Sequence, residues 1–133
     1  MIAVQEETYT IQEVAEATGV SAHTLRYYEK IGLLTDVGRH ENGHRRYVED
    51  DLGWIHFLKL LRETGMPIQH MQQFMEFARQ GDSTIADRIE VLTEHRRELA
   101  ANIAQLQDHL EHLDRKIAYY NGLLTNEPTE PCD

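Results

Sequence analysis

The sequence is poor in cysteine and contains no long apolar run. Cys132 is its single cysteine, which excludes an intrachain disulfide and a thiolate cluster of the kind that holds structural zinc. No apolar stretch is long enough to cross a bilayer, and residues 1–7 are acidic and lack the apolar core of a signal peptide. We therefore expect a cytoplasmic protein that does not associate with membranes.

The sequence also lacks the motifs of common enzyme classes. It contains no glycine-rich phosphate loop, no His-Glu-x-x-His and no nucleophile elbow. His109 and His112 lie three residues apart and could share a helix face as metal ligands do, but further ligands are not evident, which favours a surface histidine pair. We therefore expect no enzymatic activity, no cofactor and no metal site.

Positive charge is scarce overall but is concentrated in one stretch. The 133 residues contain 13 lysines and arginines against 23 acidic residues, a net charge of -10, which by itself disfavours a partner as negative as DNA. Residues 21–48, however, carry five basic and three acidic residues, whereas residues 81–133 carry five basic and eleven acidic residues. The pattern to explain is a local basic face inside an acidic chain.

Two short helices are predicted near the N-terminus. Thr10 and Glu13 have the spacing of a capping box, which predicts a helix over residues 11–18. Gly19 ends that helix, and Ser21 is the N-cap of a second helix that continues to about residue 30. This spacing is typical of a helix-turn-helix, although any tight pair of helices shares it. The residues expected in its small core are Ile11, Val14, Ala15, Val20 and Leu25.

Residues 34–47 are predicted to form a small β-ribbon, or wing. Asn42-Gly43 is a strong hairpin signal, and the flanking segments are short. A solvated turn is the alternative, but beside a helix-turn-helix the wing is favoured. The tip and flanks of the wing carry three arginines and two histidines: Arg39, His40, His44, Arg45 and Arg46.

A second pair of helices is expected after the wing. Three acidic residues from Glu49 open a third helix that ends at Thr64-Gly65, and Pro67 opens a fourth. The apolar faces of these two helices indicate packing against a core. Those faces comprise Leu52, Trp54, Ile55, Phe57, Leu58 and Leu61, followed by Ile68, Met71, Phe74, Met75 and Ala78.

The C-terminal third shows the clearest periodicity in the chain. Apolar residues recur there in steps of four and three, a heptad seam with one polar member, Arg96. A helix of this length, roughly 60 Å, cannot bury such a stripe alone, and the economical partner is a second copy of the chain. The full seam is Ile85, Ile89, Leu92, Arg96, Leu99, Ile103, Leu106, Leu110, Leu113, Ile117, Tyr120 and Leu124.

The segment Thr24-Leu25-Arg26-Tyr27-Tyr28-Glu29-Lys30-Ile31-Gly32-Leu33 resembles the N-terminal signature of the MerR family of bacterial transcription regulators. The match continues through Arg39, Glu41-Asn42-Gly43 and Arg45-Arg46-Tyr47 and covers about the first 80 residues. The resemblance implies a mainly α fold. Residues 1–80 would form a winged helix-turn-helix domain with a small β-ribbon, residues 81–124 a long coiled-coil dimerisation helix, and residues 125–133 a tail.

The resemblance also implies a function. Regulators of this family are homodimers, joined by an antiparallel coiled coil, that occupy a pseudo-palindromic operator inside a promoter spacer. In the activated state the dimer bends and untwists double-stranded promoter DNA, so that RNA polymerase holoenzyme engages both promoter elements. A small-molecule effector is a further expected partner. In this chain the dimer would use the seam residues Ile89, Leu92, Leu99, Ile103, Leu106, Leu110, Leu113, Ile117 and Tyr120.

The DNA contacts carried over from the family fall into two groups. The second helix would enter the major groove, where His23, with its neighbours Ala22 and Thr24, is the candidate for base readout. The other residues would contact the DNA backbone. They are Arg26, Tyr27, Arg39, Asn42, His44, Arg45, Arg46, Tyr47 and Arg62, with His44 in a place often held by an aromatic residue.

The third helix also resembles that of the short family members that respond to aldehydes and thiol stress. Those regulators carry a reactive cysteine in this helix, where Leu60 or its neighbours stand here, so the thiol chemistry is missing. The cysteines of the family's metal sensors are missing as well.

The sequence is compatible with two other functions. One is a coiled-coil adaptor that binds a partner protein through its acidic helix, and the other is an architectural or excision-type DNA-binding factor. Salt-dependent duplex binding that Arg26→Ala weakens would distinguish a regulator from an adaptor. A factor of the excision type lacks a long dimerising helix.

Overall fold

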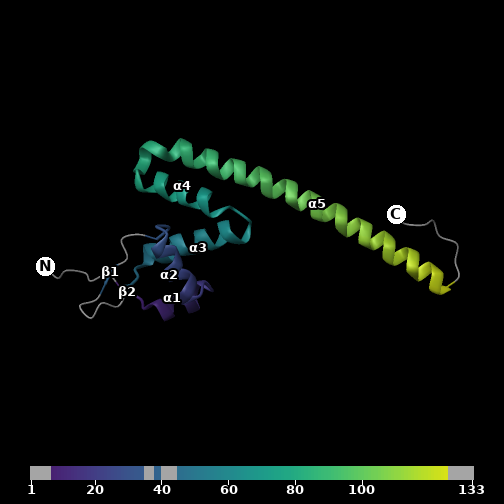
Figure 1. Ribbon diagram of the computed structural model, residues 1–133, viewed down its shortest axis with the longest axis horizontal. Helices are drawn as coiled ribbons and strands as arrows, with labels where there is room; N and C mark the ends of the chain where they lie inside the picture. The colour runs from purple at the N-terminus through teal and green to yellow at the C-terminus, as the bar shows by residue number, and fades with distance from the viewer. Residues whose placement is uncertain (1–6, 35–37, 40–44, 126–133) are drawn as a thin grey trace. The chain divides into compact units, whose positions relative to one another are not determined.

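A computed structural model of the chain describes residues 7–34, 38–39 and 45–125. The described residues are mainly helical, as the sequence predicts, with one short two-stranded ribbon (Figure 1). They fall into two compact units, residues 1–91 and 92–133, and the division lies inside the last helix. The elements in chain order are α1 Ile11–Thr18, α2 Ala22–Lys30, β1 Gly38–Arg39, β2 Arg45–Arg46, α3 Glu49–Glu63, α4 Ile68–Arg79, the 3-10 turn η1 Gly81–Thr84 and α5 Ile85–Thr125.

The first two helices form the predicted helix-turn-helix. The Glu13 amide donates to the Thr10 hydroxyl at 3.1 Å, and the Thr10 amide donates to the Glu13 carboxylate at 2.9 Å, so the capping box is complete. Gly19 ends α1 with φ of 75°, a left-handed conformation that favours glycine. Ser21 then caps α2 by accepting the Thr24 amide at 3.1 Å.

A single apolar core lies beneath the helices of the first unit. Four of the five residues predicted for the helix-turn-helix core are buried, and Ala15 is half-buried. Further apolar side chains on α2, in the segments after α2 and α3, and at the end of the wing complete this core. They are Tyr28, Leu33, Leu34, Tyr47 and Met66.

The wing forms as a short antiparallel ribbon. Gly38 is in register with Arg46, and Arg39 with Arg45. Asn42, Gly43, His40 and His44, on which the hairpin prediction rested, lie outside the described residues. At the base of the ribbon Tyr47 forms a bridge with Tyr9 through backbone hydrogen bonds of 2.7 and 2.9 Å, which ties the returning strand to the N-terminal segment.

The second helical pair begins and ends close to the predicted positions. The apolar side chain of Val48 cannot cap α3. Instead, the Asp51 carboxylate accepts a hydrogen bond of 2.8 Å from the Val48 amide. Pro67 precedes α4 as its N-cap. Phe57 and Phe74 pack with ring centroids 5.2 Å apart, which joins α3 to α4. Trp54, predicted on the apolar face, is 37% exposed.

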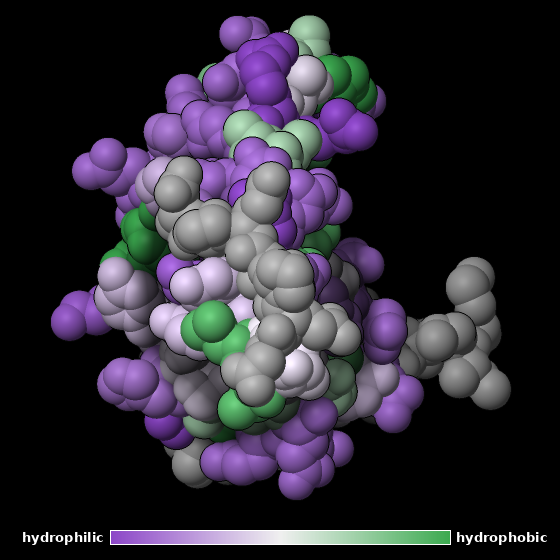
Figure 2. Space-filling model, turned by 90° about the vertical axis from the view of Figure 1, so that its right-hand side faces the viewer, coloured by the Kyte–Doolittle hydropathy of each residue, from purple (hydrophilic) through white to green (hydrophobic). Residues whose placement is uncertain are grey.

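The last helix, α5, is continuous over 41 residues, about 62 Å at 1.5 Å per residue. In the described part of the chain, no helix has the length and apolar character needed to span a membrane. On the face seen in Figure 2 most side chains are hydrophilic, and hydrophobic ones lie among them in small groups. Such scattered groups are ordinary on protein surfaces, so periodicity, rather than exposure alone, marks the seam on α5.

Candidate nucleic-acid interface

The exposed face of α2 gathers the basic and aromatic side chains expected of a recognition helix. His23, Arg26, Tyr27 and Lys30 are exposed and follow the helical spacing of three, four and seven residues. Leu25, on the opposite side of the helix, has 0% exposure and anchors α2 in the core. The packing of α2 therefore directs a row of cationic and hydrogen-bonding groups outward.

Lys30 was not among the predicted site residues, although it lies on the same face of α2. Its position seven residues after His23 was the available signal, because that spacing returns a helix to nearly the same face. Thr24, which was predicted to face the groove, is half-buried, and its hydroxyl accepts a hydrogen bond from the Ser21 hydroxyl at 3.0 Å. Thr24 thus takes part in the cap of α2.

The C-terminal end of α2 is hydrogen-bonded to α4. Gln72 donates through Nε2 to the Ile31 carbonyl at 3.1 Å, and Arg79 donates through Nη2 to the Gly32 carbonyl. Carbonyls at the end of a helix have no partner within that helix, so two side chains from α4 satisfy groups that would otherwise need water. The orientation of the recognition helix is therefore set by the helix that leads into η1 and α5.

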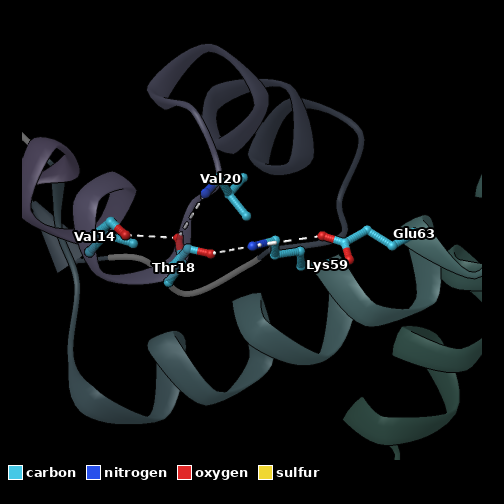
Figure 3. Close-up of polar contacts among 5 residues, drawn as sticks. All are labelled: Val14, Thr18, Val20, Lys59 and Glu63. Atoms are coloured by element: carbon cyan, nitrogen blue, oxygen red, sulfur yellow. Dashed lines mark hydrogen bonds and ion pairs between the residues drawn. The ribbon is translucent and has the colours of Figure 1, made fainter.

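A second polar contact holds the turn between α1 and α2 against α3 (Figure 3). The Thr18 hydroxyl donates to the Val14 carbonyl at 2.8 Å and accepts the Val20 amide at 3.2 Å. Lys59 donates to the Thr18 carbonyl at 3.0 Å and lies 3.7 Å from the Glu63 carboxylate. The Lys59 ammonium therefore lies at the negative end of α1, where a cation is favoured.

The left-handed backbone conformation after Thr18 favours glycine. A Cβ at Gly19 would lie 2.7 Å from the Lys59 Nζ, and φ of 75° is unfavourable for any other common residue. Gly19 therefore adopts the backbone conformation that the turn needs and leaves room for the Lys59 side chain.

Tyr47, which was predicted to contact the DNA backbone, is buried in the core. Its side chain has 0% exposure. Its backbone pairs with Tyr9 at the base of the wing.

Arg46 is also partly engaged within the chain. Its guanidinium donates to the Thr8 hydroxyl at 2.8 and 3.1 Å, and the side chain is half-buried. Arg39 and Arg45 occupy paired positions in the ribbon, and Asn42 and His44 lie outside the described residues. Arg62 is exposed in the last turn of α3.

Two side chains near the start of the described chain have shifted pKa values, Tyr9 and Glu13. The hydrogen bond from the Tyr9 hydroxyl to the Glu49 carboxylate, 3.1 Å long, raises the pKa of Tyr9. The backbone amide of Thr10 lowers the pKa of Glu13 by donating to its carboxylate.

In residues 7–34, 38–39 and 45–125, no group of three or more His, Cys, Asp or Glu side chains is placed to hold a metal ion.

Comparison with known proteins identifies the family. The description "MerR HTH family regulatory protein" matches residues 9–78, and the description "MerR, DNA binding" matches residues 52–116. The chain belongs to the MerR family. It is a DNA-binding transcriptional regulator, which confirms the resemblance drawn from the sequence and the prediction of a non-enzymatic protein.

Several relatives of this MerR regulator cover most of its length. An uncharacterized HTH-type transcriptional regulator of Haemophilus influenzae is 41% identical over 113 residues, which are 85% of this chain and 84% of the relative. AdhR of Bacillus subtilis is 38% identical over 89 residues, 67% of this chain and 64% of AdhR. The crystal structure of HiNmlR, a MerR family regulator lacking the sensor domain, bound to promoter DNA, matches with a TM-score of 0.82 and 38% identity. It covers 91% of this chain and 92% of HiNmlR.

Proposed function

We propose that two copies of this MerR regulator, joined by an antiparallel coiled coil, bind a pseudo-palindromic operator inside a promoter spacer in the cytoplasm. In its activated state the dimer bends and untwists the DNA so that RNA polymerase holoenzyme engages both promoter elements. The observation that carries the proposal is the exposed basic face of α2. The described relative HiNmlR, which is bound to promoter DNA in its crystal structure, supports it.

In this proposal α2 lies in the major groove. His23 reads base edges at the start of the helix, with Thr24 beside it at the cap. Arg26, Tyr27 and Lys30 contact phosphates, because the two cations and the tyrosine hydroxyl at these exposed positions reach the strands that border the groove. The remaining backbone contacts come from Arg62 and from the wing, through Arg39, Asn42, His44, Arg45 and Arg46.

Local charge explains how a chain with a net charge of -10 binds DNA. Residues 81–133 carry eleven acidic and five basic residues, whereas residues 21–48, which include α2 and the wing, carry five basic and three acidic residues. Beyond a Debye length of about 8 Å at physiological salt, charges are largely screened, so the contact face dominates the interaction. We expect binding to weaken steeply with salt, since phosphate contacts release counterions.

A footprint of the purified protein on promoter DNA next to its own gene tests the proposal. We expect a protected inverted repeat within a long promoter spacer, at low salt and more weakly at higher salt. Arg26→Ala should lower affinity about tenfold and reduce the dependence of affinity on salt by about one phosphate contact. The matched control is Arg97→Ala, which removes the same charge from the exposed surface of α5.

Other outcomes distinguish the alternative functions. No specific protection at low salt, together with unchanged binding by Arg26→Ala, would contradict the proposal and favour a coiled-coil adaptor. Protection without any effect on transcription by RNA polymerase would favour an architectural factor.

A further inference from the structure

The seam on α5 is uncovered in the described residues. Ile103, Leu106 and Leu113 are 48%, 66% and 60% exposed, and the seam continues to Leu124, which is 84% exposed. A continuous apolar stripe of this kind marks an interaction surface. Because its members repeat every seven residues, the partner that fits is another helix with the same repeat.

The length of the seam selects one pairing with a second copy. Suppose that two α5 helices run antiparallel with Ile85 opposite the partner's Leu124. Every seam residue then faces a seam residue of the partner, from this outermost pair to the central pair, Ile103 opposite the partner's Leu106. A shift by one heptad in either direction leaves two seam residues of each subunit without a partner. The full overlap therefore buries the most apolar surface.

The single charged seam residue selects the same arrangement. In a parallel pair Arg96 would face the partner's Arg96, and like charges would meet inside the seam. In the antiparallel overlap Arg96 faces the partner's Leu113, with the partner's Asp114 next along the helix. An ion pair then becomes available to both arginines of the dimer.

The polar contacts within the chain leave Arg96 and Asp114 available. Neither side chain has a hydrogen bond or an ion pair in the part of the chain that the structure describes, and both are exposed. The neighbouring Arg97, on the outer surface of α5, pairs with Glu94. Arg96 is thus the cation on α5 that lies in the seam and has no partner on its own helix.

We propose that α5 pairs with a second copy in this antiparallel register, with the two-fold axis between residues 104 and 105, and that Arg96 pairs with the partner's Asp114. The inference rests on the dimer of the proposed function and specifies how it is built. A polar residue in a seam lowers stability but disfavours competing registers. A slip by one heptad places Arg96 opposite the partner's Leu106 or the partner's Tyr120, and neither of these is followed by an acidic residue as Leu113 is.

Distances between spin labels test the register. Glu94→Cys and Arg115→Cys, each in a Cys132→Ser background, place one label per subunit on the side of α5 away from the seam. Both sites lie equally far from the proposed axis, so pulsed electron paramagnetic resonance should give equal distances, with an axial component of about 32 Å. A slip of one heptad would give unequal axial components of about 42 and 21 Å.

Each result either supports or overturns the inference. Equal long distances support the register. Unequal distances overturn the register while leaving the dimer intact, and short distances at both sites indicate a parallel coil. A monomer in sedimentation equilibrium would contradict both this inference and the proposed dimer, whereas the footprint tests DNA binding separately.

Charge reversal tests the ion pair. Arg96→Glu and Asp114→Arg should each raise the dimer dissociation constant about tenfold, because every change occurs twice per dimer, and the double variant should restore most of the affinity. Arg97→Glu is the control and should change it less than about twofold. Equal losses in the single variants with no recovery in the double variant would contradict the pair.

Replacement of Arg96 by an apolar residue separates stability from specificity. Arg96→Leu should tighten the dimer, because a seam leucine buries more apolar surface, but it should broaden the spin-label distances into more than one population. A single unchanged distance in Arg96→Leu would show that Arg96 does not set the register.

Discussion

The two units of the chain reach stability in different ways. In the first unit, fully buried side chains such as Val14, Leu25, Ile55, Leu58 and Met71 come from four different helices and form one core. In the described part of the second unit, residues 92–125, only Gly122 is buried. The first unit therefore contains its own hydrophobic core, whereas the second needs a partner to bury its seam.

This contrast separates the tasks of a MerR regulator. In the proposed dimer, affinity for DNA depends on a domain that folds from its own contacts, and the spacing between the two domains depends on an association that varies with concentration. Changes in the two units should therefore affect different measurements.

The largest effect is expected from breaking the seam. The double variant Leu106→Glu, Leu110→Glu should raise the dimer dissociation constant about a thousandfold, because charges replace apolar contacts near the centre of the coil in both subunits. Sedimentation equilibrium measures the change, and thermal unfolding of the first unit should persist. Gln105→Glu, on the outer face, is the control. A dimer of normal affinity would contradict the role of the seam.

A core substitution should act on the first unit alone. Leu58→Ala should lower the free energy of unfolding by about 3 kcal/mol, since Leu58 has 0% exposure and its loss leaves a cavity. The control in the same helix is Leu60→Ala, because Leu60 is 53% exposed and its truncation should have little effect. Chemical denaturation measures both. Similar losses in the two variants would show that the core is not where the structure places it.

The contact between α2 and α4 should matter for DNA affinity more than for folding. Gln72→Met removes the hydrogen bond to the Ile31 carbonyl and should weaken operator binding about fivefold, which corresponds to a net hydrogen bond of about 1 kcal/mol. The slope of affinity against salt should stay unchanged, unlike that of Arg26→Ala, because Gln72 contributes no phosphate contact. A changed slope in Gln72→Met would contradict this positioning role.

The smallest effect concerns the pH dependence of the α1 cap. The pKa of Glu13 is lowered in the folded protein, so its carboxylate stabilises the fold above the ordinary glutamate pKa, and this contribution is lost as pH falls through the lowered value. At neutral pH the melting temperature of Glu13→Gln should be lower than that of the parent protein, and this difference in melting temperature should shrink in acid. A difference that grows in acid would have the wrong sign for this cap.

Features defined by neighbouring residues could be predicted from the sequence. The capping box of Thr10 and Glu13, the stop at Gly19 and the heptads of α5 depend on spacings of three to seven residues, and each appears in the structure. The basic face of α2 can be predicted from the helical repeat, and the same repeat places Lys30 on that face.

The tertiary structure alone decided which of these residues are buried, exposed or held in place. Tyr47 lies in the core, Arg46 is bound to Thr8, and Gln72 and Lys59 reach carbonyls 41 residues earlier in the chain. The sequence by itself determined the order of elements, the family and the seam. Contacts between residues distant in sequence depend on how helices pack, and no local spacing encodes them.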